Sequence, residues 1–311
     1  MGMQLFRVGR SYLFVCLVLQ ACWVLGKPLA AAELTVRYPV PTPPFGIIYD
    51  YFGQVLDLAL SKTVERYGPY RLAPIEMRAS NLRLNVLLEA GEDVDLLLVS
   101  PNRERDQRFI PVRIPLDKGM LGYRVLMIRA GDADRFAEVR SADDLKHITL
   151  GQGFDWEDMH ILTAAGYDVE AGSDYSSLLD MLLLGRFNGF PRGVYEIDNE
   201  IDFHTAAGRG GMAVENTLML HYRSTRIVYV NKKNAALAQR IEEGLRAAIK
   251  DGSFDALFLR HPTIAKGLAL ANAAGRRTFE LPNPRFPPDF PVDDPTLWYR
   301  PAPQGRMSEL R

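Results

Sequence analysis

A nearly unbroken apolar run from Val94 to Val99 constrains the fold of this chain most. Such a run is typical of a strand that is buried on both faces, as in parallel sheets covered by helices. Upstream, the strand-like segments 34–38 and 70–77 alternate with the segments 49–67 and 81–90, whose apolar residues have helical spacing. The order strand, helix, strand, helix, strand predicts a parallel sheet with right-handed crossovers.

The same plan starts again after a link through Gly119. Its segments, strand-like and helical in turn, are 147–150, 156–165, 167–170 and 175–184. A strand at 225–230 and an amphipathic helix at 234–250 follow. Two successive α/β units predict an α/β protein of two lobes, each a mixed, mostly parallel sheet flanked by helices.

The N-terminus has the pattern of a secretory signal peptide. Arg7 and Arg10 precede an apolar run at 12–26, and Ala30-Ala31-Ala32 forms a small-x-small cleavage site. The run is shorter than the ~20 residues that a transmembrane helix needs. We therefore expect that residues 1–32 are a cleaved signal peptide and that the mature chain is periplasmic. An uncleaved membrane anchor is the alternative.

Both cysteines, Cys16 and Cys22, lie in that N-terminal segment. The sequence Leu19-Gln20-Ala21-Cys22 loosely resembles a lipobox, so a lipoprotein anchored at Cys22 is a further alternative. Cleavage after Ala32 leaves no cysteine, and hence no disulfide, thiolate metal site or cysteine nucleophile. It removes three basic and no acidic residues, which changes the formal charge from −1 to −4. An acidic chain without a basic stretch predicts no nucleic-acid partner.

Eight prolines lie between Leu281 and Pro303. No long helix or strand is compatible with that density. We expect residues 281–311 to form a Pro-rich C-terminal tail that lies on the body of the protein or is mobile. Trp298 and Tyr299 are its candidate docking points.

Five short motifs follow one another along residues 34–260. They are Pro43-Pro44-Phe45, Val94-Asp95-Leu96 with Ser100-Pro101-Asn102-Arg103, Gly151-Gln152-Gly153-Phe154-Asp155, Gly185-Arg186-Phe187-Asn188, and Lys250-Asp251-Gly252-Ser253-Phe254. In this order they resemble the amino-acid-binding (family 3) branch of the type II extracytoplasmic solute-binding proteins of ABC transporters. The resemblance implies a periplasmic-binding-protein-like fold, with two hinged lobes around a ligand cleft. It implies lobe 1 at 33–122 plus 226–280, and lobe 2 at 123–225.

The resemblance also implies ligand-binding residues on the first lobe. Arg103 matches the family arginine that pairs with the ligand carboxylate, where a guanidinium makes two parallel hydrogen bonds. Ser100 would add a hydroxyl, and Tyr38 and Phe45 would stack on the ligand. The alternatives are a solvated arginine, an ordinary helix cap and packing in the core.

On the second lobe, the implied ligand-binding residues are Gln152, Phe154, Asp155 and Trp156, at the start of a predicted helix. Trp156 would line the cleft wall opposite Phe45, with core burial as the alternative. An ordinary helix N-cap is the alternative role of Asp155.

The chain departs from the family pattern at residues 189–193. The amino-acid binders usually place an aspartate there for the amine of the ligand, whereas this sequence has Gly189-Phe190-Pro191-Arg192-Gly193. If Arg192 faces the cleft together with Arg103, the ligand carries two anionic groups. The alternative is a turn residue that pairs with Glu196 at i,i+4 spacing.

Catalytic and metal-binding motifs are missing from the sequence. It has no Gly-x-Ser-x-Gly, His-Glu-x-x-His or Walker pattern, and its histidines lack ligand spacing. We therefore predict that the chain is not an enzyme and that it binds no cofactor and no metal ion. We predict a monomeric solute-binding protein that captures a small polar, anionic or carboxylate-bearing solute for an inner-membrane transporter. The alternatives are a stand-alone periplasmic sensor or accessory protein and a dehydratase-like enzyme on the same scaffold.

Overall fold

A computed structural model describes residues 32–301 of the chain. The predicted signal peptide, apart from Ala32, and both of its cysteines lie outside the described residues, as does the end of the C-terminal tail. Within the described residues, no helix has the length and apolar character that a membrane crossing requires.

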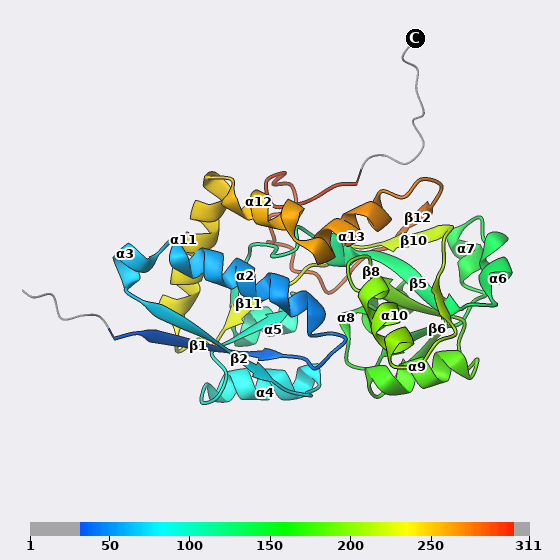
Figure 1. Cartoon of the computed structure of the whole chain (residues 1–311), viewed down its shortest axis with the longest axis horizontal. Coiled ribbons are helices and arrows are strands. Elements are labelled where there is room, and N and C mark those ends of the chain that lie inside the picture. The colour runs from blue at the N-terminus through cyan, green and yellow to red at the C-terminus, as the bar shows by residue number, and fades with distance from the viewer. Residues whose placement is uncertain (1–31, 302–311) are drawn as a thin grey trace, which may run out of the picture.

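The first lobe contains two small sheets (Figure 1). In one, β1 (Leu34–Val40) pairs in parallel with β2 (Tyr70–Glu76). In the other, β11 (Ile227–Val230) lies between β3 (Leu96–Val99) and β4 (Ile110–Val112) and is antiparallel to both. The helices of this lobe are α2 (Ile47–Ser61), α3 (Val64–Tyr67), α4 (Asn81–Ala90), α5 (Arg103–Arg108), α11 (Ala235–Lys250) and α12 (Ser253–Arg260). The apolar face predicted for α11 is buried, where the helix packs against α2.

The second lobe is built on a seven-stranded sheet, drawn mostly in green in Figure 1. Its order is β12-β10-β5-β8-β6-β7, and β9 pairs with β5. The strands are β5 (Tyr123–Arg129), β6 (Leu150–Gly153), β7 (Val169–Gly172), β8 (Gly189–Gly193), β9 (Met212–Val214), β10 (Leu218–His221) and β12 (Arg277–Glu280). The helices are α6 (Ala133–Ala137), α7 (Ala142–Leu145), α8 (Glu157–Ala164), α9 (Tyr175–Leu183) and α10 (Ile197–Ala206), and α13 (Pro262–Ala271) leads from the first lobe into β12.

These sheets confirm the predicted α/β class with mixed sheets, but fewer strand pairs are parallel than predicted. Four of the nine pairs formed by the described residues are parallel. The reason is that β5 and β11, which follow the crossings between the lobes, run antiparallel to their neighbours. The predicted domain limits stay a prediction, and the strand pairing places β12 in the sheet of the second lobe.

The chain crosses between the lobes at two segments that lie against each other, 113–122 and 222–226, which we call the hinge. The first includes the 3₁₀ helix η1 (Met120–Gly122). The backbone N–H of Tyr222 donates to the carbonyl of Gly122 at 3.2 Å. A Cβ on Gly122 would clash with the carbonyl of Tyr222, so the two segments approach this closely only because residue 122 is glycine.

Residues 281–301, which we call the C-terminal strap, pack on the first lobe. Phe286 and Phe290 are buried in a cluster with side chains of β3 and β11, and Trp298 packs against them. The backbone N–H of Tyr299 donates to the carbonyl of Lys118 in the hinge at 2.8 Å. The described part of the predicted tail therefore lies on the body of the protein and is docked at Trp298 and Tyr299.

Candidate functional site

The two lobes are in contact, and the largest apolar cluster of the protein runs through both. Phe45, in the loop after β1, meets two aromatic residues of the second lobe. Its ring centroid lies 5.8 Å from that of Trp156 and 4.4 Å from that of Tyr175. A pocket beside Phe45 and α10 has a volume of about 10 Å³. That volume holds at most one water molecule, so this part of the lobe contact is closed.

Four aromatic side chains, which we call the aromatic cage, surround the guanidinium of Arg192 at this contact. The Cζ atom of Arg192 lies 5.2, 5.2, 5.8 and 5.1 Å from the ring centroids of Phe45, Trp156, Tyr175 and Phe190. Phe45 belongs to the first lobe and the other three belong to the second. A guanidinium over aromatic faces is attracted by their quadrupoles, by roughly 2 kcal/mol when the pair is desolvated.

Two carboxylates of α10 and its N-cap neutralise the caged guanidinium. Glu200 accepts hydrogen bonds from Nε and Nη2 of Arg192 at 2.8 and 2.6 Å, and Glu196 lies 3.1 Å from Nη2. Burial alone would raise the pKa of Glu196, but the attraction of Arg192, Arg124 and Arg226 outweighs it and lowers that pKa to about 2. Glu196 therefore stays charged at neutral pH, and this lobe contact recognises a guanidinium by charge, paired hydrogen bonds and aromatic faces.

Arg105 of the first lobe forms another buried ion pair, and this pair joins the two lobes. Its Nη1 atom lies 3.1 Å from Oε1 of Glu157, in α8 of the second lobe, and both side chains are less than one-tenth exposed. Asn102 also donates to Glu157, and Arg285 of the C-terminal strap lies 3.2 Å from its other oxygen. A carboxylate is thus held at the lobe contact by two guanidinium groups and one amide.

Buried charges continue from the aromatic cage to the hinge. Arg124, in β5, lies 2.7 Å from Asp158 and 3.2 Å from Glu196, and it donates to the hydroxyl of Tyr222 at 3.0 Å. Arg226 of the hinge lies 3.8 Å from Glu196. The position of Glu196 is therefore coupled to both the cage and the hinge.

Two buried donors near these groups have no hydrogen-bond partner within residues 32–301. They are the amide nitrogen of Gln152, whose side chain is fully buried, and Nε of Arg226. Leaving a buried donor unpaired costs about 1 to 3 kcal/mol. Each of these atoms is therefore a place where a water molecule or a polar group of a solute would be stabilised.

The structure brings three of the predicted site residues together, namely Phe45, Trp156 and Arg192. Trp156 lies opposite Phe45, as predicted from the sequence. Arg192 pairs with Glu196, which is the alternative role considered for it, and its guanidinium faces the lobe contact. Its role in binding an anionic ligand together with Arg103 stays a prediction. Strand β8 orients Arg192 and Phe190 to the same side because they are two residues apart.

The other predicted residues of the first lobe lie outside the aromatic cage. Tyr38 is buried in the core of the lobe, against Gly53 of α2. Arg103 is exposed, whereas its neighbour Arg105 is buried. Ser100 contributes its backbone carbonyl, which accepts a hydrogen bond from Arg105. The ligand-binding roles of Tyr38, Arg103 and Ser100 stay predictions.

On the second lobe, Phe154 is exposed and Gln152 is buried. Asp155 is not the N-cap of α8, because Trp156 occupies that position without a side-chain cap. Instead, the carboxylate of Asp155 accepts a hydrogen bond from the backbone N–H of Asn81 at 2.7 Å, across the lobe contact. The ligand-binding roles of these three residues also stay predictions.

Five residues of the lobe contact were not predicted from the sequence: Tyr175, Phe190, Glu200, Arg105 and Glu157. Two signals point to some of them. Phe190 alternates with Arg192 on a strand, and Glu196 and Glu200 are four residues apart on one helical face. The pairing of Arg105 with Glu157 has no such signal, because it depends on how the lobes meet.

The described part of the chain contains no group of three or more His, Cys, Asp or Glu side chains placed to hold a metal ion. The side chains at the lobe contact are suited to holding cationic and carboxylate groups, through guanidinium–carboxylate pairs and aromatic faces.

No family model and no curated protein matches the chain. Its fold matches solved structures. One is an ancestral arginine-binding protein bound to arginine, with 18% identity, a TM-score of 0.51, and coverage of 72% of this chain and 96% of that chain. A second is a probable amino-acid ABC transporter extracellular-binding protein from Bacillus subtilis, with 15% identity, a TM-score of 0.53 and coverage of 74% and 98%.

A third is a periplasmic binding protein of Salmonella typhimurium with high arginine specificity, with 15% identity, a TM-score of 0.52 and coverage of 72% and 97%. At such identities the similarity bears on the fold, and it extends over nearly the whole of each of these proteins. The chain therefore has the two-lobed fold of the type II periplasmic solute-binding proteins and resembles in structure their amino-acid-binding branch.

Proposed function

We propose that this chain is an extracytoplasmic solute-binding protein that holds a small polar solute between its lobes and presents it to a membrane transporter. The fold supports this role, because similar structures include amino-acid-binding proteins of ABC transporters. The observation that carries the proposal is the aromatic cage, in which one residue of the first lobe and three of the second enclose a single charged group. Such convergence of both lobes on one polar group is what solute recognition in an interlobe cleft requires.

The charged groups at the contact indicate the chemistry of the solute. Arg105 holds a carboxylate, that of Glu157, and a solute carboxylate would take the same place. Arg192 is already neutralised by Glu200 and Glu196, which disfavours it as a site for a second anionic group. We therefore propose a solute with one carboxylate. Arginine, which two of the similar proteins bind, has one carboxylate and also a cation.

Binding requires the lobes to separate, because the pocket beside the aromatic cage holds about 10 Å³. The hinge permits this motion at two short segments, one of which contains Gly122. On separation, the carboxylate of Glu157 leaves Arg105, and Phe45 leaves the other three rings. The solute would then replace contacts that the protein makes with itself, and the two unpaired donors of Gln152 and Arg226 would gain partners.

Thermal denaturation against a library of amino acids and small carboxylates tests this proposal. A solute at 100 times its Kd adds about 2.7 kcal/mol of stability, which raises Tm by roughly 5 to 10 °C at this chain length. Trp156→Ala should abolish the increase, and the exposed control Arg66→Gln should retain it. The absence of any shift across the library, with the wild-type protein folded, would contradict solute capture.

A stand-alone sensor or accessory protein of the same fold is the second candidate. One observation favours it: the chain's own guanidinium and carboxylate fill the lobe contact, so the protein's own side chains hold the lobes together. A protein of this kind presents its closed form to a membrane partner. It would give no thermal shift with any solute, and small-angle scattering would show no further compaction.

We propose that the chain is not an enzyme. Catalysis on this scaffold would appear as chemical conversion of a bound solute, and mass spectrometry of the solute before and after incubation detects it. Recovery of the solute unchanged, with and without Glu157→Gln, is the expected result.

A further inference from the structure

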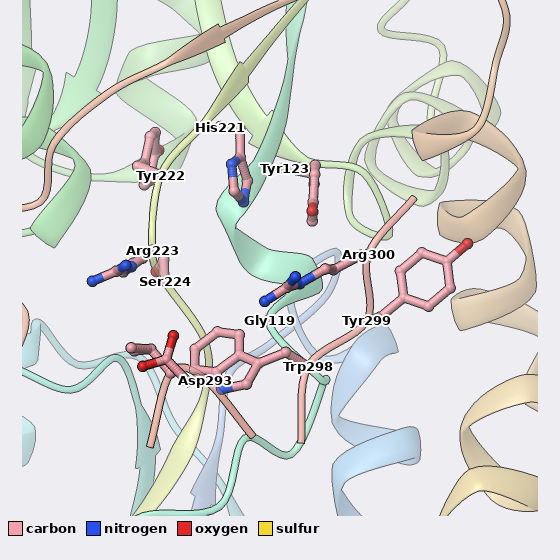
Figure 2. Close-up of a pocket in the computed structure, with 11 residues that line it drawn as sticks. Gly119, Tyr123, His221, Tyr222, Arg223, Ser224, Asp293, Trp298, Tyr299 and Arg300 are labelled. Carbon is pink, nitrogen blue, oxygen red and sulfur yellow. The ribbon is translucent and has the colours of Figure 1, made fainter. Parts of the chain in front are cut away.

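A second cavity lies where the C-terminal strap crosses the hinge (Figure 2). Its volume is about 130 Å³, and it shares no lining residue with the aromatic cage. The hinge side contributes Tyr123, His221 and Ser224, and the strap contributes Trp298, Tyr299 and Arg300. A cavity of ~150 Å³ holds one benzene ring. This cavity, which we call the hinge pocket, is therefore close to the size of one aromatic ring.

Two arginines at the hinge pocket are free to meet an anion. Within residues 32–301, the guanidinium groups of Arg223 and Arg300 form no ion pair and no hydrogen bond, and both residues are exposed. Figure 2 shows Arg300 reaching toward the middle of the pocket, above Trp298, whereas Arg223 points away from Arg300. Asp293 is the one carboxylate that lines the pocket among the described residues, and Glu280 lies 2.6 Å from Nδ1 of the lining residue His221. Arg300 is therefore the group of the lining that is placed to meet an anion.

Two hydroxyl groups add hydrogen-bonding capacity. Ser224 is 2% exposed, and within the described residues its hydroxyl has no hydrogen-bond partner. Tyr123 is 9% exposed, and Figure 2 shows its hydroxyl pointing toward Arg300. Burial raises the pKa of Tyr123 to about 12, so this hydroxyl keeps its proton at neutral pH and can donate it. Neither hydroxyl oxygen is among the fully buried unpaired atoms of the described residues, so both are accessible to a ligand in the pocket.

The walls of the hinge pocket are also partly apolar. The indole of Trp298 forms one side and packs over Gly119, where a Cβ would clash with it. On the opposite side, the rings of Tyr123 and His221 stack with centroids 4.2 Å apart. A ligand of this pocket thus needs an apolar, flat part as well as a negative charge, which an inorganic ion does not have.

We propose that the hinge pocket binds a small aromatic carboxylate, with its carboxylate at Arg300 and Ser224 and its ring against Trp298. Because the walls belong to both hinge segments and to the strap, an occupant holds the three together. Occupancy is therefore coupled to the arrangement of the lobes, and a cleft solute and a hinge-pocket ligand alter the affinity for each other by the same factor.

Titration with sodium benzoate, followed by calorimetry and by NMR of the imidazole signals, tests the proposal. His221 is the one histidine of the five in the sequence that lines the pocket, so its ring reports on this site. We expect benzoate to shift the His221 signals and to leave the other four unchanged. Arg300→Gln should weaken binding roughly tenfold, the scale of one charge-assisted hydrogen bond. Inorganic phosphate and acetate, which lack a ring, should bind more weakly than benzoate.

The exposed control Arg66→Gln, in α3 of the first lobe, should bind benzoate like the wild type. Since Arg300 has no partner within the described residues, Arg300→Gln should keep the wild-type Tm, so a loss of binding cannot be attributed to unfolding. Unchanged His221 signals, or equal affinity of the wild type and Arg300→Gln, would overturn the proposal. Benzoate should shift the His221 signals of the wild type whether or not any amino acid binds in the cleft, which separates this test from that of the cleft.

Discussion

Replacement of Arg192 by alanine perturbs the aromatic cage most directly. The substitution removes a guanidinium that makes two hydrogen bonds to Glu200 and lies near four aromatic rings. Glu196 and Glu200 then remain buried without their main counter-charge. Breaking a buried ion pair from one side costs about 3 to 5 kcal/mol. That is a large share of the roughly 5 to 15 kcal/mol that stabilises a folded protein.

The assay is urea unfolding followed by tryptophan fluorescence, together with thermal denaturation. We expect Arg192→Ala to lower the free energy of unfolding by about 4 kcal/mol and the Tm by about 10 °C. Methylguanidinium at low concentration should restore part of that Tm, because the substitution leaves a space with the shape and charge of a guanidinium. It should not stabilise the wild type, in which Arg192 fills the cage.

The control is Arg66→Ala, which removes an exposed arginine paired with Glu243 and should change stability by less than about 0.5 kcal/mol. If Arg192→Ala lowers the free energy of unfolding by less than about 1 kcal/mol, the contact of Arg192 with the aromatic cage and its carboxylates does not stabilise the protein as described. Equal stabilisation of the variant and the wild type by methylguanidinium would refute the recognition of the guanidinium by its surroundings.

Three further predictions concern the lobe contact, acid stability and the strap. Glu157→Gln leaves the buried Arg105 without its carboxylate. Small-angle scattering of the solute-free protein should therefore show a larger radius of gyration than for wild type or for the partly exposed control Glu242→Gln; an unchanged radius would contradict this role. The pKa of Glu196 is lowered from its ordinary value of 4.5 to about 2. The stability that this carboxylate contributes is therefore fully present above pH 4.5 and is lost as the pH falls toward 2. Between pH 4.5 and pH 2, the free energy of unfolding of the wild type, measured by urea titration, should therefore fall by on the order of 3 kcal/mol more than that of Glu196→Gln. Parallel pH profiles of the two proteins would disprove the lowered pKa of Glu196. Gly119→Ala places a Cβ against Trp298 at a residue with positive φ. This substitution should lower the free energy of unfolding by at least about 1 kcal/mol and speed proteolysis of the strap. An unchanged cleavage rate would argue against the packing of Trp298 on Gly119.

Elements with local sequence signals could be predicted well. Helix α4 spans 81–90, as expected, because Ser80 caps its start and Gly91 ends it in the left-handed conformation. Helix α5 was not predicted, because the sequence Arg-Glu-Arg-Asp-Gln-Arg at 103–108 has no apolar face. Strand β8 contains two glycines and a proline, which are typical of turns. The pairing of this strand with β5 overrides that local preference.

The candidate site could be predicted only in part. The contact of Phe45 with Trp156 follows from the implied two-lobed fold, because both residues lie in loops that face the cleft. The pairing of Arg192 with Glu196 was expected from their i,i+4 separation, although the turn between strand β8 and helix α10 brings them together and not a helix. In contrast, the partner of Arg105 is 52 residues away along the chain. Its identity depends on the relative position of the lobes, which no local pattern determines.

Mass spectrometry of the small molecules released on denaturing the purified protein tests solute capture most directly. We predict one carboxylate-bearing solute, recovered in near-stoichiometric amount from the wild type and from Arg66→Gln, and missing from Trp156→Ala. We also predict that adding this solute back raises the Tm of the stripped wild type. Recovery of no such solute, or equal recovery from Trp156→Ala, would contradict the assignment of the interlobe contact as the binding site.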